Sequence, residues 1–385
     1  MIARALGGAV ATALVLGACA GGAGPGAGAG SSAAAPTSDT AAAGTEARLY
    51  VPNQEDATVS VLDPATGRVL ETVDLRTHGF TANAKPHAVI AEPDGSAWYV
   101  TLIGDNAVAK FDRAGRLLGQ ARMETPGMLA LDPRHDRLYA SRSMTAVSPP
   151  SSVGVVRRSD MALLDETDVM LPRPHGIAVD TASGRLFVSG LGDNRLAVMD
   201  TAGRVEVADV PGPLHAYVTL ALSPDGTRLA ASTQLTAKLL GFDVSGAGGA
   251  PRLLGGADVL PFGYQVAWSP DGRSVWLGNQ RSRAVTEVDA AAWRVAGVVR
   301  DSSFAEPHGV AVSPDGGTVY VSSHGRATGA AAPTPADTMH HGMHAGEGAP
   351  RGGGTLALID ARTRAVRRVT PVGRFATAIG LGGVR

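Results

Sequence analysis

Residues 174–200 read PHGIAVDTASGRLFVSGLGDNRLAVMD, and similar stretches recur along the chain. The clearest copies are PHAVIAEPDGSAWYVTLIGDNAVAKFD at 86–112 and PHGVAVSPDGGTVYVSS at 307–323, and looser copies begin at residues 126, 214 and 264. Neighbouring copies begin about 40 to 50 residues apart, which is close to the period of a four-stranded propeller blade. The repeat therefore predicts an all-β chain built from blades.

Each copy contains the same order of strand and turn signals. The apolar run GIAV at 176–179 suits a strand that is buried on both faces. A Pro-Asp-Gly or Ala-Ser-Gly turn follows, in which Gly accepts a positive φ. An alternating strand such as LFVSG, a polar turn, a strand ending in Asp and a variable fourth strand complete the copy. We call these strands A to D, from the inside of the blade outward.

The ends of the folded region complete the count. Residues 48–75, RLYVPNQEDATVSVLDPATGRVLETVDL, supply strands B, C and D without a strand A, whereas GRFATAIGLGG at 373–383 is typical of a lone strand A. Joining the two segments closes the ring and leaves no open sheet edge. The sequence thus predicts a seven-bladed β-propeller whose last blade combines N-terminal strands B, C and D with a C-terminal strand A.

The repeat unit PHGVAVSPDGGTVYVSS, with neighbours such as GDNRLAVMD, resembles the YVTN-repeat family of β-propellers across residues 47–385. This resemblance implies the fold. Related propellers include cell-surface repeat proteins, gluconolactonase-like hydrolases and streptogramin B lyases, so the fold alone does not select a function.

The first residues are typical of a secretory signal. The apolar run from Ala5 to Leu16 follows one Arg and is too short to span a bilayer, which predicts a signal peptide over 1–18. The tetrapeptide LGAC at 16–19 resembles the lipobox of bacterial lipoproteins, and this resemblance implies lipidation of Cys19, the only cysteine in the chain. The alternative is an unmodified Cys beside a conventional cleavage site.

These observations predict the domain organisation and the location. Residues 19–46 are rich in Ala and Gly and predict a flexible tether, so the propeller occupies 47–385. The expected location is extracytoplasmic, with the lipid anchored in a bacterial membrane and the protein in the periplasm or on the outer face of the cell membrane. A net charge of −1 and the lack of a basic block argue against nucleic acid as a partner.

Most histidines are predicted to share one end of the propeller, because strand A starts at the end where strand B finishes. We call this end the top face. Only His135, in a turn between strands A and B, belongs to the opposite end. At the start of strand A, an imidazole can cap a backbone carbonyl or can hold a metal ion on the axis, and the sequence leaves both interpretations open. The candidates at or beside strand A are His78, His87, His175, His215, His308 and His324.

The insertion 324–353 between strands B and C of its blade contains TMHHGMH at 338–344. Thioether and imidazole groups suit copper, so this loop is a candidate metal site. The alternative is a solvated low-complexity loop. The candidate ligands in the loop are Met339, His340, His341, Met343 and His344, and His324, His87, His175, His215 and His308 are the candidates outside it.

The sequence therefore predicts a lipid-anchored binding or scaffold propeller whose partners are the membrane and a protein or metal ion, with copper or another transition metal at the top face. The alternative is a metal-dependent lyase or lactonase at the central channel. For such an enzyme Glu306 is the acid beside a strand A, and Gln265 and Asn279 are candidates to orient a substrate. The sequence assigns no residue a catalytic role.

Overall fold

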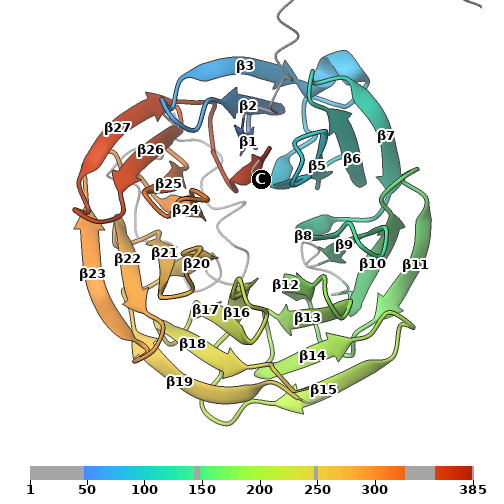
Figure 1. The fold of residues 1–385 in the computed structure, drawn as a ribbon. Coiled ribbons are helices and arrows are strands. Elements are labelled where there is room, and N and C mark those ends of the chain that lie inside the picture. Colours follow the sequence, from blue (N-terminus) through green and yellow to red (C-terminus); the bar gives the residue numbers. More distant parts are fainter. Residues whose placement is uncertain (1–46, 143–147, 149, 247–249, 326–351, 384–385) are drawn as a thin grey trace, which may run out of the picture. The chain divides into compact units, whose positions relative to one another are not determined.

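The structure is a computed structural model that describes residues 47–142, 148, 150–246, 250–325 and 352–383. In this part of the chain, seven four-stranded antiparallel sheets form a ring of blades around a central axis (Figure 1). The prediction of a seven-bladed β-propeller is confirmed. The described residues contain one short helix, η1 (Leu75–His78), and no helix among them is long and apolar enough to cross a membrane.

The blades follow one another along the chain, and the strands of each run in order from the axis to the outer edge. Blade 1 contains β28 (Gly380–Gly382), β1 (Arg48–Asn53), β2 (Thr58–Leu62) and β3 (Val69–Asp74). Blade 2 contains β4 (Pro86–Ala91), β5 (Ala97–Leu102), β6 (Ala107–Asp112) and β7 (Leu117–Arg122). Blade 3 contains β8 (Pro126–Asp132), β9 (Arg137–Arg142), β10 (Ser152–Arg157) and β11 (Leu163–Asp168).

The other four blades have the same arrangement. Blade 4 contains β12 (Pro174–Asp180), β13 (Arg185–Gly190), β14 (Arg195–Met199) and β15 (Val205–Asp209). Blade 5 contains β16 (Tyr217–Leu222), β17 (Arg228–Thr233), β18 (Lys238–Asp243) and β19 (Arg252–Asp258). Blade 6 contains β20 (Gly263–Trp268), β21 (Ser274–Asn279), β22 (Ala284–Asp289) and β23 (Arg294–Arg300). Blade 7 contains β24 (Pro307–Val312), β25 (Thr318–Ser323), β26 (Thr355–Asp360) and β27 (Val366–Pro371).

Blade 1 closes the ring as predicted. Its inner strand β28 pairs with β1, with Gly382 opposite Arg48 and Gly380 opposite Tyr50. An isolated bridge joins Ala376 to Asn53. The inner strand is therefore shorter than the segment 373–383 suggested, because Thr377 leaves the regular register and donates its N–H to the Pro52 carbonyl.

The hydrophobic core is divided among the contacts between blades. Each of seven clusters of buried side chains joins two neighbouring blades. Between blades 1 and 2, the Trp98 ring stacks on Phe111 at 4.4 Å and on Tyr50 at 5.2 Å. Because a blade buries its faces only against its neighbours, the closed ring is the unit that folds.

Candidate functional site

The start of the inner strand has an unusual backbone conformation in every blade. One residue there has a φ between 45° and 61°, although none of the seven is glycine. In blades 2 to 7 the inner strand then shifts its register against the second strand, as a β-bulge does. A bulge redirects a side chain from the regular alternation. The seven residues with positive φ are Lys85, Thr125, Arg173, Ala216, Phe262, Glu306 and Phe375.

The second residue after each of these positions contributes to an inner ring around the axis. Three of the seven are histidines, and their side chains meet one another. The His87 ring centroid lies 6.4 Å from that of His175 and 6.0 Å from that of His308. These residues come from blades 2, 4 and 7, which are not neighbours, so the contacts cross the axis. The inner-ring residues are His87, Gly127, His175, Val218, Tyr264, His308 and Thr377.

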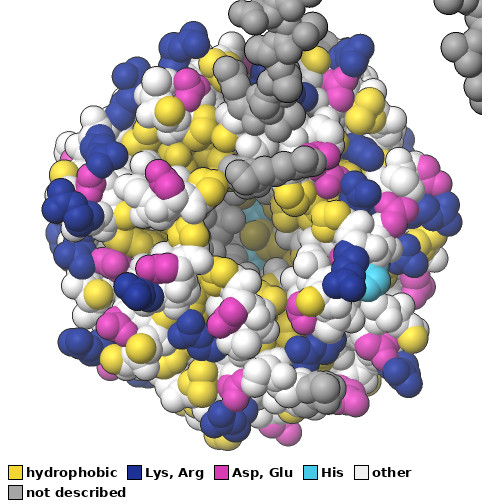
Figure 2. Space-filling model, viewed as in Figure 1, with side chains coloured by type: hydrophobic (Ala, Val, Ile, Leu, Met, Phe, Trp, Pro, Cys, Tyr) yellow, Lys and Arg dark blue, Asp and Glu magenta, His cyan; other side chains and the backbone are white. Residues whose placement is uncertain are grey.

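Small side chains leave room for these contacts. Gly127 separates His87 from His175 around the ring, and Thr377 separates His308 from His87. Figure 2 shows histidine side chains in cyan inside the central opening. Three imidazoles can therefore extend from distant blades into one axial cluster.

The histidines are held by hydrogen bonds, most of which join neighbouring blades. His87 Nδ1 lies 3.2 Å from Gln54 Oε1 of blade 1. His175 Nδ1 donates to the Val218 carbonyl of blade 5, which is the contact expected of a structural histidine that caps a backbone carbonyl. The His308 ring bonds the Thr377 backbone. These contacts fix one nitrogen of each ring.

Burial keeps these imidazoles neutral. Desolvation, followed by the charges of neighbouring imidazoles, holds the pKa of His87 and His308 well below the ordinary value of 6.5. Desolvation also lowers the pKa of His175 to about 4. Among the described residues, buried His87 Nε2 and His308 Nδ1 have no hydrogen-bond partner. Each of these two nitrogens therefore presents a lone pair.

A carboxylate and a fourth histidine extend the cluster at blade 7. His324 follows β25, and its ring centroid lies 4.7 Å from that of His308. His324 Nδ1 is 3.3 Å from Glu306 Oε2 and 3.3 Å from Gln280 Nε2, and its ring stacks on Phe375 at 3.8 Å. The structure thus brings together two residues, Glu306 and His324, that the sequence placed only on the same face.

Other predicted residues lie elsewhere. His215 Nδ1 is 2.7 Å from Thr236 Oγ1, and its ring centroid is 5.6 Å from that of Tyr217. The hypothesis that Asn279 orients a substrate is wrong, because its fully buried amide donates to the Leu260 carbonyl and accepts from Thr286 Oγ1 at 2.6 Å. Buried Gln265 Oε1 has no hydrogen-bond partner in the described part of the chain.

Several predicted site residues lie outside the described residues. They are Cys19 and the loop residues Met339, His340, His341, Met343 and His344. Within the described residues, no group of three or more His, Cys, Asp or Glu side chains is arranged to hold one metal ion.

Two glutamines that support the cluster were not predicted from the sequence. Gln54 and Gln280 each follow the second strand of a blade, in the dipeptide Asn-Gln at 53–54 and 279–280. His324 occupies the same place in blade 7. The shared dipeptide is a signal in the sequence, but the contact of Gln54 with His87 requires the three-dimensional arrangement.

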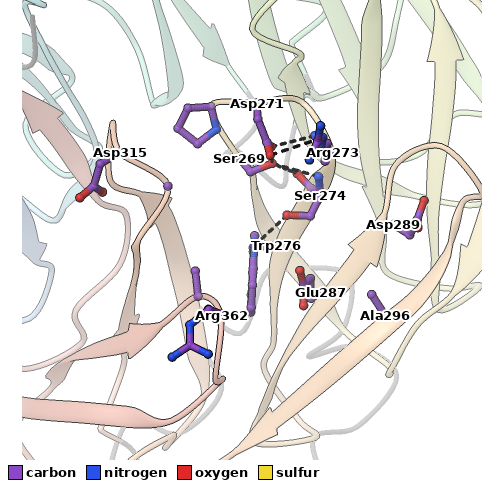
Figure 3. Close-up of a pocket in the computed structure, with 13 residues that line it drawn as sticks. Ser269, Asp271, Arg273, Ser274, Trp276, Glu287, Asp289, Ala296, Asp315 and Arg362 are labelled. Carbon is purple, nitrogen blue, oxygen red and sulfur yellow. Dashed lines mark hydrogen bonds and ion pairs between the residues drawn. The ribbon is translucent and has the colours of Figure 1, made fainter.

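A second feature lies between blades 6 and 7, at the turns that join inner strands to second strands. This pocket has a volume of about 500 Å³ and contains several carboxylates (Figure 3). The carboxylates serve the turns and the contact between blades: Asp271 accepts from Ser269 Oγ at 2.6 Å, and Glu287 pairs with Arg364 at 2.6 Å. The acids of the pocket are Asp271, Glu287, Asp289 and Asp315.

Comparison with known proteins supports the fold. No family model matches the chain. The uncharacterized protein YncE of Salmonella typhi is 23% identical over 282 residues, which cover 69% of this chain and 75% of YncE. The periplasmic gluconolactonase PpgL of Pseudomonas aeruginosa superposes with a TM-score of 0.65 at 18% identity, covering 87% of this chain and 98% of PpgL.

A further solved structure has the same architecture. A putative 6-phosphogluconolactonase of Bacteroides fragilis superposes with a TM-score of 0.63 at 14% identity, covering 88% of this chain and 99% of its own. At such identities the similarity establishes a shared fold only. The chain is a seven-bladed β-propeller similar to YncE and to the solved structures of PpgL and of a putative 6-phosphogluconolactonase.

Proposed function

We propose that this protein is an extracytoplasmic binding propeller that holds a transition-metal ion among the imidazoles at the top of its channel. One observation carries the proposal: His87, His175 and His308 come from non-neighbouring blades, yet the His87 ring centroid lies 6.4 Å from that of His175 and 6.0 Å from that of His308. A histidine with a purely structural role within its own blade does not require contact with histidines of distant blades, so these contacts favour a shared ligand.

The chemistry of the cluster suits such an ion. Neutral imidazole is a ligand for Zn, Cu, Fe and Ni. A metal-binding imidazole is usually oriented by a hydrogen bond to its other nitrogen, and Gln54 and Thr377 make such bonds with His87 and His308. In His87 and in His308, one ring nitrogen is thus hydrogen-bonded and the other is bare, which is the arrangement of a metal-binding imidazole.

The remaining parts of the proposal rest on sequence. A lipid on Cys19 would anchor the protein in a bacterial membrane. The loop residues Met339, His340, His341, Met343 and His344 would supply further copper ligands, because thioether sulfur and imidazole both bind copper. The resemblance to YVTN-repeat propellers and the likeness to a periplasmic protein are consistent with a place outside the cytoplasm.

Elemental analysis tests the metal proposal. The protein is exposed to copper or zinc, desalted and analysed, alongside a variant that combines His87→Asn with His308→Gln. With at least one of the two metals, we expect about one ion per chain in the wild type and a loss of that ion in the double variant. A variant with serine at residues 339–341, 343 and 344 separates axial binding from binding by the loop. Equal metal content in the wild type and the double variant would contradict an axial site.

A second candidate function is hydrolysis of a lactone. The observation that favours it is the Glu306–His324 contact of 3.3 Å at the channel, combined with the similarity to PpgL. Glu306 would orient His324, which would take a proton from water as the water adds to the lactone carbonyl; the proton then passes to the ring oxygen as its bond to carbon breaks.

Glucono-δ-lactone is a suitable substrate for testing this candidate. A general base contributes about 100-fold or more to the rate, so His324→Asn should lower kcat by at least that factor while Glu306→Gln has a smaller effect. His135→Asn, at the opposite end of the propeller, is the matched control. A wild-type rate no faster than that of the buffer would eliminate this function.

A further inference from the structure

Within the cluster, His87 and His308 form one pair of rings, each with a bare nitrogen. His87 Nε2 and His308 Nδ1 are both buried, and neither has a hydrogen-bond partner within the described residues. The two ring centroids are 6.0 Å apart, with an angle of 71° between the ring planes. The separation of these two rings can be compared with the separation expected for ligands of a two-coordinate or a four-coordinate ion.

The separation of the rings restricts the coordination number. With a metal–nitrogen distance of about 2.0 Å, two imidazoles on one ion have centroids about 6.4 Å apart when the ligands are in line and about 5.2 Å apart at a tetrahedral angle. An ion bound by both bare nitrogens at the observed centroid separation of 6.0 Å would have an angle at the metal of about 140°. The pair therefore fits an ion that accepts two ligands in a wide-angle arrangement better than a tetrahedral ion.

A third imidazole is poorly placed to join this pair. The His175 centroid is 6.4 Å from that of His87, at the limit for ligands in line, and the His324 centroid is 4.7 Å from that of His308, closer than the two rings of a tetrahedral pair. This agrees with the finding that no three ligand side chains of the described residues converge on one point.

The electrostatics of the pair favour a low charge on the ion. His87 and His308 are both more than nine-tenths buried, and within the described residues no hydrogen bond or ion pair links either ring to a carboxylate. The nearest acid in the cluster, Glu306, contacts His324 instead. The cost of moving an ion out of water rises with the square of its charge, so a neutral buried site penalises a divalent ion about four times as much as a monovalent ion.

We propose that His87 Nε2 and His308 Nδ1 form a two-coordinate site for a soft monovalent ion, Cu(I), and discriminate against Zn(II) and Cu(II). This inference rests on the proposed metal-binding function and specifies its ion. Cu(I) accepts two nitrogen ligands at a wide angle, whereas structural Zn(II) takes four.

The variants that test the pair follow from its hydrogen bonds. His87→Asn places an amide where Nδ1 meets Gln54 and removes Nε2. His308→Gln places an amide where Nε2 lies and removes Nδ1. His215→Asn is the matched control, because this histidine lies at the same end of the propeller and has its own partner, Thr236. All variants are made in the full chain with serine at residues 339–341, 343 and 344, so that the loop contributes no ligand.

The measurement is competition for Cu(I) against a coloured chelator under reducing, oxygen-free conditions. We expect one Cu(I) per chain in the parent and in His215→Asn, and an affinity lower by about 100-fold or more in His87→Asn and His308→Gln. The X-ray absorption edge of the bound copper should be that of two-coordinate Cu(I), and a hundredfold excess of Zn(II) should not displace it. Circular dichroism establishes that each variant is folded.

The outcomes separate this inference from the proposed function. Binding of Zn(II) or Cu(II) that depends on His87, without binding of Cu(I), would overturn the Cu(I) inference and leave the metal-binding proposal standing. Binding of none of these ions in the loop-substituted parent would overturn both. Cu(I) binding of equal affinity in His87→Asn, His308→Gln and the parent would overturn the assignment of the pair.

Discussion

The axial histidines should make the metal-free protein sensitive to mild acid. His175 is 2% exposed, and burial lowers its pKa from 6.5 to about 4. At about 1.36 kcal/mol per pKa unit, the full effect on the free energy of unfolding is about 3 kcal/mol. The sign follows from proton binding. Between pH 6.5 and 4 the unfolded chain binds a proton at this residue and the folded chain does not, so stability falls as the pH falls through this window.

The perturbation is His175→Asn. The asparagine amide can still donate to the Val218 carbonyl, as His175 Nδ1 does, but it does not titrate. Between pH 7 and pH 5, linkage attributes to His175 a loss of about 2 kcal/mol in the free energy of unfolding. The wild type should therefore lose about 2 kcal/mol more than the variant over this interval, whatever their absolute stabilities.

Urea unfolding at a series of pH values, with EDTA present, measures this difference. His78→Asn is the control, because His78 lies in η1 with its ring against Phe111, outside the axial cluster. Equal pH dependence in the wild type and in His175→Asn would refute the reasoning. If His78→Asn reduced the pH dependence of the free energy of unfolding by the same amount, the effect would not be specific to the axial histidine.

Three further predictions concern the stability and the association state of the protein. Trp293 is 8% exposed and packs against Gly241 of the preceding blade, so Trp293→Ala should lower the free energy of unfolding by about 3–5 kcal/mol. Leu118→Ala is the control, because Leu118 is exposed and its loss should change this free energy little. Equal losses for the two variants in urea unfolding would count against this prediction. Glu92 of blade 2 accepts hydrogen bonds from Tyr99 of the same blade at 2.6 Å and from Arg158 of blade 3 at 2.7 Å. Glu92→Gln should therefore lower the free energy of unfolding by about 1–3 kcal/mol, and an unchanged urea midpoint would contradict this. Removal of residues 376–385 deletes β28 and exposes the edge of β1, so size-exclusion chromatography should show association or aggregation instead of the wild-type elution position.

Local patterns in the sequence were sufficient for the architecture. Consecutive apolar residues, Pro-Asp-Gly turns and alternating strands recur at a regular interval, and each copy contains enough local information to form four strands. The segment 373–383 could be assigned to blade 1 because blade 1 lacked an inner strand and a closed ring leaves no unpaired edge. Fold prediction worked because these signals lie within single repeats.

The composition of the site was only partly predictable. Pro-His pairs placed His87, His175 and His308 at the start of inner strands, and antiparallel geometry placed them on one face. The partner of His87 is Gln54, 33 positions away in another blade, and no pattern at either position specified their contact. Asn279 was misassigned because its sequence position resembles a site residue while its amide is used inside its own blade and the adjacent connection.

The sequence by itself determined the strands, their order in each blade, the number of blades and the placement of His87, His175 and His308 at the start of inner strands, because these depend on residues that are close along the chain. Only the tertiary structure decided which imidazoles meet. That outcome depends on the closure of the ring, on the bulge that redirects each side chain at the start of an inner strand, and on small residues such as Gly127 and Thr377 beside the histidines. Contacts across the axis join blades 2, 4 and 7, so they exist only when all the blades are in place.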